Sequence, residues 1–214
     1  MKKLFFYSTA LVIILSSCKK DESKTEIETT CGTPFNYSKD VLVVNEGPWG
    51  GNGTLSHINL ENNEITSNVY EKANCDIPAG LFIQSVAVNE GKGYVVVNGS
   101  AEIQIVDLST FKHEKTISLS YPRYMAFNEG KGYVTNGTNE GKVFVIQDKK
   151  ITDSINVAKG PESILSSGAH LIVANKGVYP DVDSTISIIN ADDHSVTNLN
   201  GWYKPNDIVE DKMV

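Results

Sequence analysis

The residues of this sequence best suited to chemistry are aromatic side chains that alternate with polar ones in short segments between apolar runs. Two such segments are Tyr121-Pro122-Arg123-Tyr124 and Trp202-Tyr203-Lys204-Pro205-Asn206. Flat rings beside amide, guanidinium and carboxylate groups suit a bulky ligand that is partly planar and partly polar. The candidate ligand-binding residues are Trp49, Gln84, Tyr121, Arg123, Tyr124, Tyr179, Asp181, Trp202, Tyr203 and Asn206.

Sequence motifs of common catalytic chemistry are absent. No G-x-S-x-G, H-E-x-x-H or phosphate-cradling glycine loop occurs, and three cysteines give no metal-binding spacing. Asp181 and Asp183 have the spacing to hold a hard cation through carboxylate oxygens, although two carboxylates in a long loop are more often solvated. We expect no resident metal and no cofactor.

The elements that must position the candidate residues are repeated along the chain. The sequence NEGKGYV occurs at 89–95 and again at 128–134, and Pro122, Pro161 and Pro205 mark the entries to successive units. Each unit contains four short runs rich in Val, Ile, Tyr and Thr, which is strand composition. Four strands in a repeat of about 40 residues are typical of a β-propeller blade. For the unit that holds the first NEGKGYV, we expect strands at 86–89, 94–98, 103–107 and 115–119.

Strand alternation sorts the loops of each blade between two faces. NEGKG is predicted to be a tight structural turn between the first and second strands. The loops after the second and fourth strands share the other face, which collects the candidate residues, and binding residues are often carried on loops over a rigid scaffold. Each unit also places an Asn at the end of its second strand, either as a ligand group or as a cap bonded to backbone: Asn45, Asn98, Asn136 and Asn175.

None of the histidines is expected on the loop face that carries the candidates. They fall in a strand or at turns on the opposite side: His57, His113, His170 and His194. No histidine general base or metal cluster is therefore expected beside the candidates. We predict that the protein is not an enzyme.

The second repeat copy carries a family resemblance. Tyr133-Val134-Thr135-Asn136, within GKGYVTNG, resembles the YVTN-type β-propeller repeat, and the segments VLVVNEGPWGGNGTLSHINL and GLFIQSVAV are similar to the surface-lipoprotein branch of that family. The resemblance runs from Val41 to the end of the sequence. It implies an all-β propeller with seven blades of four antiparallel strands, of which about four are present. We therefore expect a piece of a longer propeller, unless residues 207–214 complete the first unit and close a four-bladed ring.

The resemblance also implies a function. Members of the branch include outer-membrane lipoproteins that capture cobalamin and pass it to a transporter. A corrinoid as ligand and an outer-membrane transporter as partner are expected on this ground alone. The alternatives are an adhesin or assembly protein and, less favoured, a propeller lactonase or hydrolase that would need catalytic residues from further blades.

The N-terminal segment indicates export. Two lysines precede the apolar run Leu4–Leu15, which is shorter than the roughly 20 residues that span a bilayer and has the length of a signal-peptide core. Leu15-Ser16-Ser17-Cys18 resembles a lipobox, which implies a signal peptide at 1–17 and a lipid on Cys18. The charged residues 19–22 resemble the tag that sends lipoproteins to the outer face of the outer membrane.

Between this anchor and the propeller at 41–214, the composition of residues 18–40 predicts a flexible stalk. In an exported protein, Cys31 and Cys75 either form a disulfide or remain thiols. The formal net charge of −7 and the lack of a basic stripe argue against nucleic acid as a partner. The sequence thus predicts a non-enzymatic lipoprotein on the cell surface that binds a bulky small molecule and contacts the membrane through its lipid only.

Overall fold

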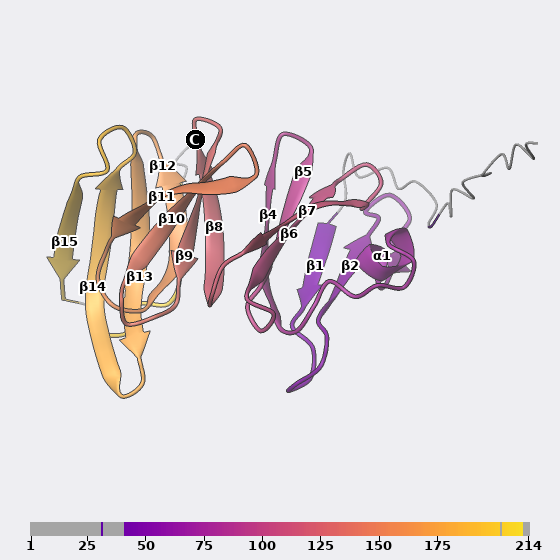
Figure 1. Cartoon of the computed structure of the whole chain (residues 1–214), viewed down its shortest axis with the longest axis horizontal. Helices are drawn as coiled ribbons and strands as arrows, with labels where there is room; N and C mark the ends of the chain where they lie inside the picture. The colour runs from indigo at the N-terminus through magenta and orange to yellow at the C-terminus, as the bar shows by residue number, and fades with distance from the viewer. Residues whose placement is uncertain (1–30, 32–40, 202, 212–214) are drawn as a thin grey trace, which may run out of the picture. The chain divides into compact units, whose positions relative to one another are not determined.

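The computed structural model describes residue 31 and residues 41–201 and 203–211. The predicted signal peptide, the lipid on Cys18 and the stalk, apart from Cys31, lie outside these residues, as does Trp202. The described part forms antiparallel sheets that follow the chain order (Figure 1). The first sheet contains β1 (Val41–Asn45), β2 (Thr54–Ile58) and β3 (Ile65–Thr66).

Three sheets of four strands follow the first one, and in each the strands pair in sequence order. The second sheet contains β4 (Ile83–Asn89), β5 (Lys92–Val97), β6 (Glu102–Asp107) and β7 (His113–Ser118). The third contains β8 (Pro122–Asn128), β9 (Lys131–Asn136), β10 (Lys142–Gln147) and β11 (Lys150–Asn156). The fourth contains β12 (Pro161–Ser167), β13 (His170–Val178), β14 (Asp181–Asn190) and β15 (Val196–Asn200). The predicted all-β fold of four-stranded antiparallel blades is confirmed.

The repeated NEGKG forms the turn between the first and second strands of a blade. Glu90 and Gly91 connect β4 to β5 with φ angles of 48° and 73°, and Glu129 and Gly130 connect β8 to β9 with 47° and 77°. Positive φ at both residues of a two-residue hairpin is the turn whose twist matches the flanking strands, and glycine adopts it without strain. The repeat is therefore a turn on the scaffold, as its sequence predicts.

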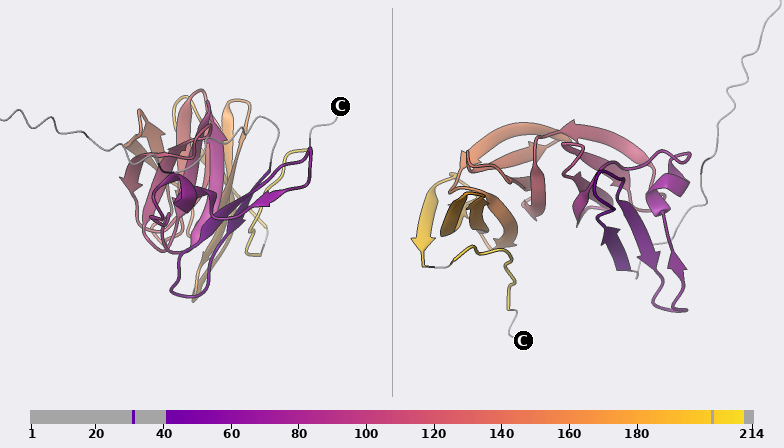
Figure 2. Two further views of the ribbon diagram at one scale, coloured as in Figure 1. Left: turned by 90° about the vertical axis from the view of Figure 1, so that its right-hand side faces the viewer. Right: turned by 90° about the horizontal axis from the view of Figure 1, so that it is seen from below.

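The apolar core lies between successive sheets rather than in one central cluster. Because side chains alternate between the two faces of a strand, Val95 and Val97 of β5 pack in the cluster toward the first sheet, while Val96 packs in the cluster toward the third. A further cluster, which includes Tyr133 and Leu171, joins the third sheet to the fourth. Figure 2 shows the sheets side by side in chain order.

The first strands of the three complete blades, β4, β8 and β12, are neighbours. The hydroxyl of Ser85 donates to the carbonyl of Arg123 at 2.8 Å, and the amide of Asn128 donates to the carbonyl of Gly168 at 2.7 Å. The blades are thus joined by hydrogen bonds as well as by the apolar clusters.

Residues 207–210 continue this arrangement beyond β12. The hydroxyl of Ser163 donates to a carboxylate oxygen of Asp207 at 3.0 Å, and that of Ser167 donates to Glu210 at 2.7 Å. This segment therefore lies along β12 in the way that β12 lies along β8, although it is not a regular strand. Among the described strands β1 pairs only with β2, so both alternatives for the blade count stay predictions.

Two features near the first sheet were not specified by the sequence patterns. A short helix, α1 (Val69–Ala73), buries Val69, Tyr70 and Ala73 in the cluster that contains Leu55 of β2. Its five residues are too few for a helical period to show. Cys31 and Cys75 form a disulfide with Cα atoms 5.2 Å apart, which is one of the two states that the sequence left open. No helix among the described residues has the length and apolarity needed to cross a bilayer.

Candidate functional site

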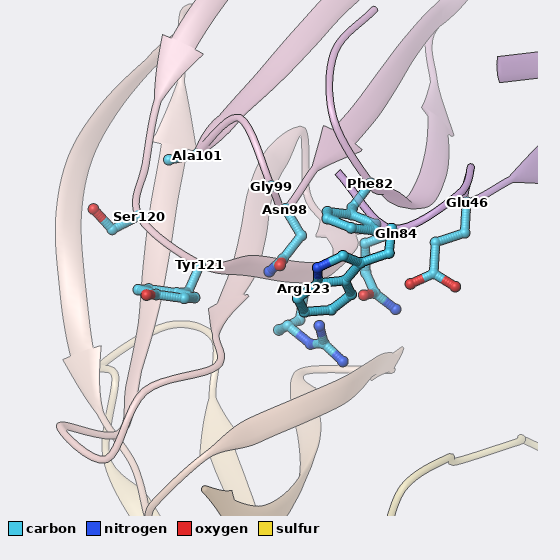
Figure 3. A pocket seen from close by; sticks show the side chains of 10 residues that line it. Glu46, Phe82, Gln84, Asn98, Gly99, Ala101, Ser120, Tyr121 and Arg123 are labelled. Carbon is cyan, nitrogen blue, oxygen red and sulfur yellow. The ribbon is translucent and has the colours of Figure 1, made fainter. Parts of the chain in front are cut away.

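One end of the blades carries a cavity of about 530 Å³, here called the large cavity. It is built from the β1–β2 loop, the start of β4, the β5–β6 loop, the β7–β8 loop and the start of β8. Its lining residues are Glu46, Trp49, Phe82, Gln84, Asn98, Gly99, Ala101, Ser120, Tyr121 and Arg123. Figure 3 shows the side chains of Gln84, Arg123 and Glu46 around one hollow. These segments belong to the loop face that the strand order predicts.

A second cavity of about 230 Å³, the small cavity, adjoins the large one. Asn98, Tyr121 and Arg123 line both, so they form the wall between the two. The other residues that line the small cavity are Gly137, Gly160, Glu162, Lys176, Gly177, Val178 and Tyr179. The two cavities therefore lie next to each other on the loop face.

Two repeated positions of the blades supply many of these residues. The first residues of β4, β8 and β12 are equivalent, since each pairs with a residue of the strand that follows it. One residue further along each of these strands stands a cavity-lining side chain: Gln84, Arg123 and Glu162. The residues that come directly after the paired partners are Asn98, Gly137 and Lys176, and all three line the small cavity.

Arg123, Glu162 and Lys176 form a charged cluster in the small cavity. Arg123 donates from Nε to Glu162 Oε2 at 2.9 Å and from Nη2 to Oε1, while Lys176 Nζ forms an ion pair with Oε2 at 3.0 Å. The Glu162 side chain is only 3% exposed. A buried carboxylate needs such pairing, because an unpaired charge out of water is costly.

The backbone around the charged cluster is also fixed. The hydroxyl of Thr135 donates to the carbonyl of Glu162 at 2.6 Å and accepts from the amide of Tyr124 at 3.0 Å. Thr135 is fully buried, so this one side chain ties β9 to β8 and to the next blade. The Thr of the GYVTNG segment is thus a structural residue that holds Glu162 in place.

Aromatic side chains stand at the rims of both cavities. Trp49 is 96% exposed, and its ring lies 5.4 Å from that of Phe82 at an angle of 55°. Tyr121 is 60% exposed between the cavities, and Tyr179 is 91% exposed beside the small one. Large exposed aromatic side chains grouped around a concave surface are typical of binding sites.

Comparison with known proteins places this chain. A family model described as "Domain of unknown function (DUF5074)" matches residues 39–210. The chain belongs to the DUF5074 family. No protein among those with curated functions matches it.

Solved structures resemble this DUF5074 chain in fold. Hydrazine synthase of Kuenenia stuttgartiensis superposes with a TM-score of 0.61 at 16% identity, over 84% of this chain and 52% of that chain. The nidogen/laminin complex gives 0.58 at 13%, over 75% and 61%. Dihydro-heme d1 dehydrogenase NirN in complex with DHE gives 0.53 at 14%, over 72% and 34%. Hydrazine synthase and NirN are β-propellers, and this chain spans about half the length of the first of these structures.

The DUF5074 fold brings together only part of the predicted site. Trp49, Gln84, Tyr121, Arg123 and Tyr179 line the cavities. The remaining described candidates line neither cavity: Tyr124, Asp181, Tyr203 and Asn206.

Two of the candidates outside the cavities, Tyr124 and Asn206, form hydrogen bonds with residues that line them. The hydroxyl of Tyr124 accepts from Gln84 Nε2 at 3.1 Å, and Asn206 Oδ1 accepts from Lys176 Nζ at 3.2 Å. Both Gln84 and Arg123 belong to the first strands of their blades, not to the preceding loops as the sequence suggests, because those strands begin at Ile83 and Pro122.

The long loop expected around Asp181 is mostly a hairpin. β13 extends to Val178 and β14 starts at Asp181, so only Tyr179 and Pro180 connect them, through a cis peptide bond. Asp181 accepts from Asn139 at 3.3 Å and pairs with Lys159 at 3.6 Å. Asp183 accepts from the backbone amides of Lys159 and Ser184. Protein donors thus use both carboxylates, and the described residues contain no cluster that could hold a metal ion.

The Asn residues predicted at the ends of second strands are bonded to the protein. Asn98 Nδ2 donates to the carbonyl of Pro122 at 3.0 Å, and Asn136 donates to the carbonyl of Ser120. Asn45 and Asn175 donate to side chains of the next strand. Asn98 also stands one residue beyond the others, because β5 ends at Val97. A cap bonded to backbone therefore fits Asn98, Asn136 and Asn175, which also donates to the carbonyl of Thr185, whereas Asn45 donates to the hydroxyls of Thr54 and Ser56.

Glu162 and Lys176 are among the cavity residues that were not predicted as candidates from the sequence. The sequence feature that could have indicated Glu162 is the repeated proline. Arg123 follows Pro122 and Glu162 follows Pro161, so the two residues hold the same position in successive blades. Among the described residues, no histidine lines either cavity. His113 contacts Thr116 at 2.9 Å, and His194 contacts Asp153 at 3.2 Å.

Proposed function

We propose that this chain is a non-enzymatic binding protein that holds a bulky, partly planar small molecule on its loop face. The observation that carries the proposal is the large cavity, in which the exposed rings of Trp49 and Tyr121 surround the polar groups of Gln84, Asn98 and Arg123. Its volume lies within the range of about 300–1,000 Å³ that is usual for small-molecule sites.

The chemistry of the cavity linings supports binding rather than turnover. The carboxylate of Glu162 is engaged by two cations, and the amide groups of Gln84 and Asn98 are hydrogen-bonded within the protein. Such groups orient a ligand without exchanging protons with it. The proposal that the protein is not an enzyme rests on this arrangement.

A corrinoid is the specific ligand that we propose. It rests on the resemblance of the sequence to the YVTN-type surface lipoproteins, and a flat macrocycle with amide-bearing side chains suits aromatic rims above amide and guanidinium groups. The same resemblance supports a lipid anchor at Cys18, a place on the outer face of the outer membrane, and delivery to an outer-membrane transporter.

Calorimetric titration of the full chain with cobalamin and with cobinamide tests this function. We expect saturable binding of either corrinoid, and a loss of at least about tenfold in affinity for Trp49→Ala, since aromatic anchors commonly contribute more than 1 kcal/mol. Tyr203→Ala is the matched control, because Tyr203 is exposed but lines neither cavity. Undetectable binding of both corrinoids would remove this ligand class.

An assembly role is the second candidate function. It is favoured by the exposure of Trp49, Tyr179 and Tyr203, which are 96%, 91% and 80% exposed, because aromatic side chains are enriched in protein interfaces. A pull-down with the full chain that recovers an outer-membrane transporter in the absence of any small molecule would favour this role. Loss of that complex on adding cobalamin would instead favour the small-molecule role.

A further inference from the structure

The small cavity presents positive charge. Its wall contains two cations, Arg123 and Lys176, and one carboxylate, that of Glu162. The side chains of the cations are 22% and 31% exposed, whereas that of Glu162 is 3% exposed. A group entering the cavity therefore meets the cations, which outnumber the buried carboxylate by one charge. This local sign is opposite to the net charge of −7 of the whole chain.

Arg123 is the only arginine in the sequence. Its guanidinium engages Glu162 through Nε and Nη2, and Nη1 is the nitrogen that Glu162 does not engage. The planar guanidinium matches carboxylate and phosphate oxygens better than an ammonium group does. All other Lys and Arg positions of the chain are lysines. Arg123, whose geometry matches an oxyanion, lies in the wall shared by both cavities.

The two cations are held in place before any ligand arrives. A Cβ at Gly137 would lie 2.8 Å from both Cγ and Cδ of Arg123, so the arginine stem packs on bare backbone. Lys176 is held between Glu162 Oε2 and Asn206 Oδ1. Fixed donors lose little conformational entropy when a ligand binds, which favours affinity.

We infer that the small cavity is a subsite for an oxyanion group, a carboxylate or a phosphate. This deepens the proposed function and rests on it, because the group belongs to the same ligand whose ring system lies against Trp49 and Tyr121 in the large cavity. Arg123 and Lys176 bind the oxyanion, and Glu162 positions them. Ligands that carry both a flat ring system and an anionic group are then preferred over their neutral counterparts.

Nuclear magnetic resonance on the full ¹⁵N-labelled chain tests the inference directly. Because the sequence has one arginine, the arginine Nε–H region contains a single signal. The probes are inorganic phosphate, 1-naphthoate and its neutral analogue 1-naphthamide. We expect phosphate and naphthoate to shift the Arg123 signal in a saturable way, naphthoate to bind more tightly than phosphate, and naphthamide to leave the signal in place.

Two test substitutions and one control substitution separate the subsite from general effects. Lys176→Gln should weaken naphthoate and phosphate by about tenfold or more, as expected for the loss of one hydrogen bond to a charged group. Lys115→Gln removes the same charge from an exposed position on β7 and should leave both affinities unchanged. Arg123→Lys, which keeps the charge but not the fork of donors, should also weaken both probes in calorimetry, with thermal unfolding showing that each variant is folded.

The outcomes distinguish this inference from the proposed function. If cobalamin binds but neither phosphate nor naphthoate shifts the Arg123 signal, the subsite is overturned and the proposed function stands. If no corrinoid binds but both anions shift the signal and Lys176→Gln weakens them, the subsite stands without that ligand. A shift by naphthamide as large as that by naphthoate overturns the preference for an anion. Equal affinities of phosphate and naphthoate overturn the link to the aromatic rims.

Discussion

At the scale of single residues, a buried carboxylate of the site, Glu162, differs from one of the scaffold, Glu71, in whether it has partners. Glu162 is buried with two cationic partners. Glu71 on α1 has two buried carboxylate oxygens without a hydrogen-bond partner in the described structure. Burial raises the pKa of Glu71 above its usual value. A paired buried carboxylate is compatible with stability, whereas an unpaired one lowers it.

Glu71→Gln is therefore expected to stabilise the fold at neutral pH. Because the pKa of Glu71 is raised in the folded state, its protonated carboxyl group contributes favourably to the free energy of unfolding below the unfolded pKa. This contribution is lost as the pH rises through the folded pKa and the group becomes charged. We expect a gain of about 1 kcal/mol in the free energy of unfolding at pH 7 and little or no gain at pH 4. Urea titrations at the two pH values measure this, with the exposed Glu61→Gln as control. A gain that is equal at both pH values would contradict the explanation.

At the same scale, Gly137→Ala tests how Arg123 is positioned. The added Cβ would lie 2.8 Å from Cγ and Cδ of Arg123, so the arginine stem has to shift. We expect a roughly tenfold loss of affinity for 1-naphthoate, comparable to losing one hydrogen bond to a charged group. Calorimetry measures it, and an unchanged affinity would show that the guanidinium is not held by this contact.

At the scale of elements, the two copies of NEGKGYV build the same turn but differ in their ion pairs. Lys92 Nζ lies 2.8 Å from Asp107 and 2.6 Å from Glu114, and Glu114 also pairs with Lys149. This network ties β5, β6 and β7 to the β10–β11 turn. Within the described residues no ion pair involves Lys131, the equivalent lysine of the second copy.

Lys92→Met is expected to cost more than Lys131→Met. Lys92 holds the pKa of Asp107 well below its usual range. A depressed pKa stabilises the fold above the unfolded pKa of about 3.9, and this stability is lost as pH falls further. We expect Lys92→Met to cost about 0.5–1 kcal/mol at pH 7, a value suited to partly exposed pairs in a network, and less below pH 4. Urea titrations of both variants measure the difference, and equal costs would argue against the network.

The elements also show what the sequence could predict and why the rest required the structure. The strands, their turns and the loop face follow from β-branched runs and strand alternation, which are local signals. The pairing of Arg123 with Glu162 depends on the register between two blades, and the sheet extension around Tyr179 depends on a two-residue connection. α1 shows no period in five residues. The first of these features arises from a contact between segments 39 residues apart, and the other two are too short to show a pattern, so composition alone does not reveal them.

At the scale of the described blades, every complete sheet shares an apolar cluster with a neighbouring sheet. The second and third sheets each contribute to two such clusters. Val95 and Val96 are adjacent in sequence, yet they stabilise different inter-sheet interfaces. A sheet that loses its packing on one side therefore weakens on both, which favours cooperative unfolding.

This cooperativity predicts how distant core substitutions behave. Leu55→Ala, in the cluster between the first and second sheets, and Leu171→Ala, in that between the third and fourth, each remove a fully buried side chain. We expect each to cost about 2–5 kcal/mol and to shift one common unfolding transition. Far-UV and near-UV circular dichroism during urea unfolding should coincide. Two separate transitions would mean that the sheets unfold independently.

The equivalence of Gln84, Arg123 and Glu162 has a consequence for the evolution and redesign of the face. The second residue of the first strand is an amide, a cation and an anion in three successive blades. Because Arg123 and Glu162 pair with each other, an exchange at either position affects two blades at once, whereas an exchange at Gln84 leaves that ion pair in place. The choice of ligand on this face thus depends on pairs of neighbouring blades, because the side chain of one blade fixes the charge that the next must carry.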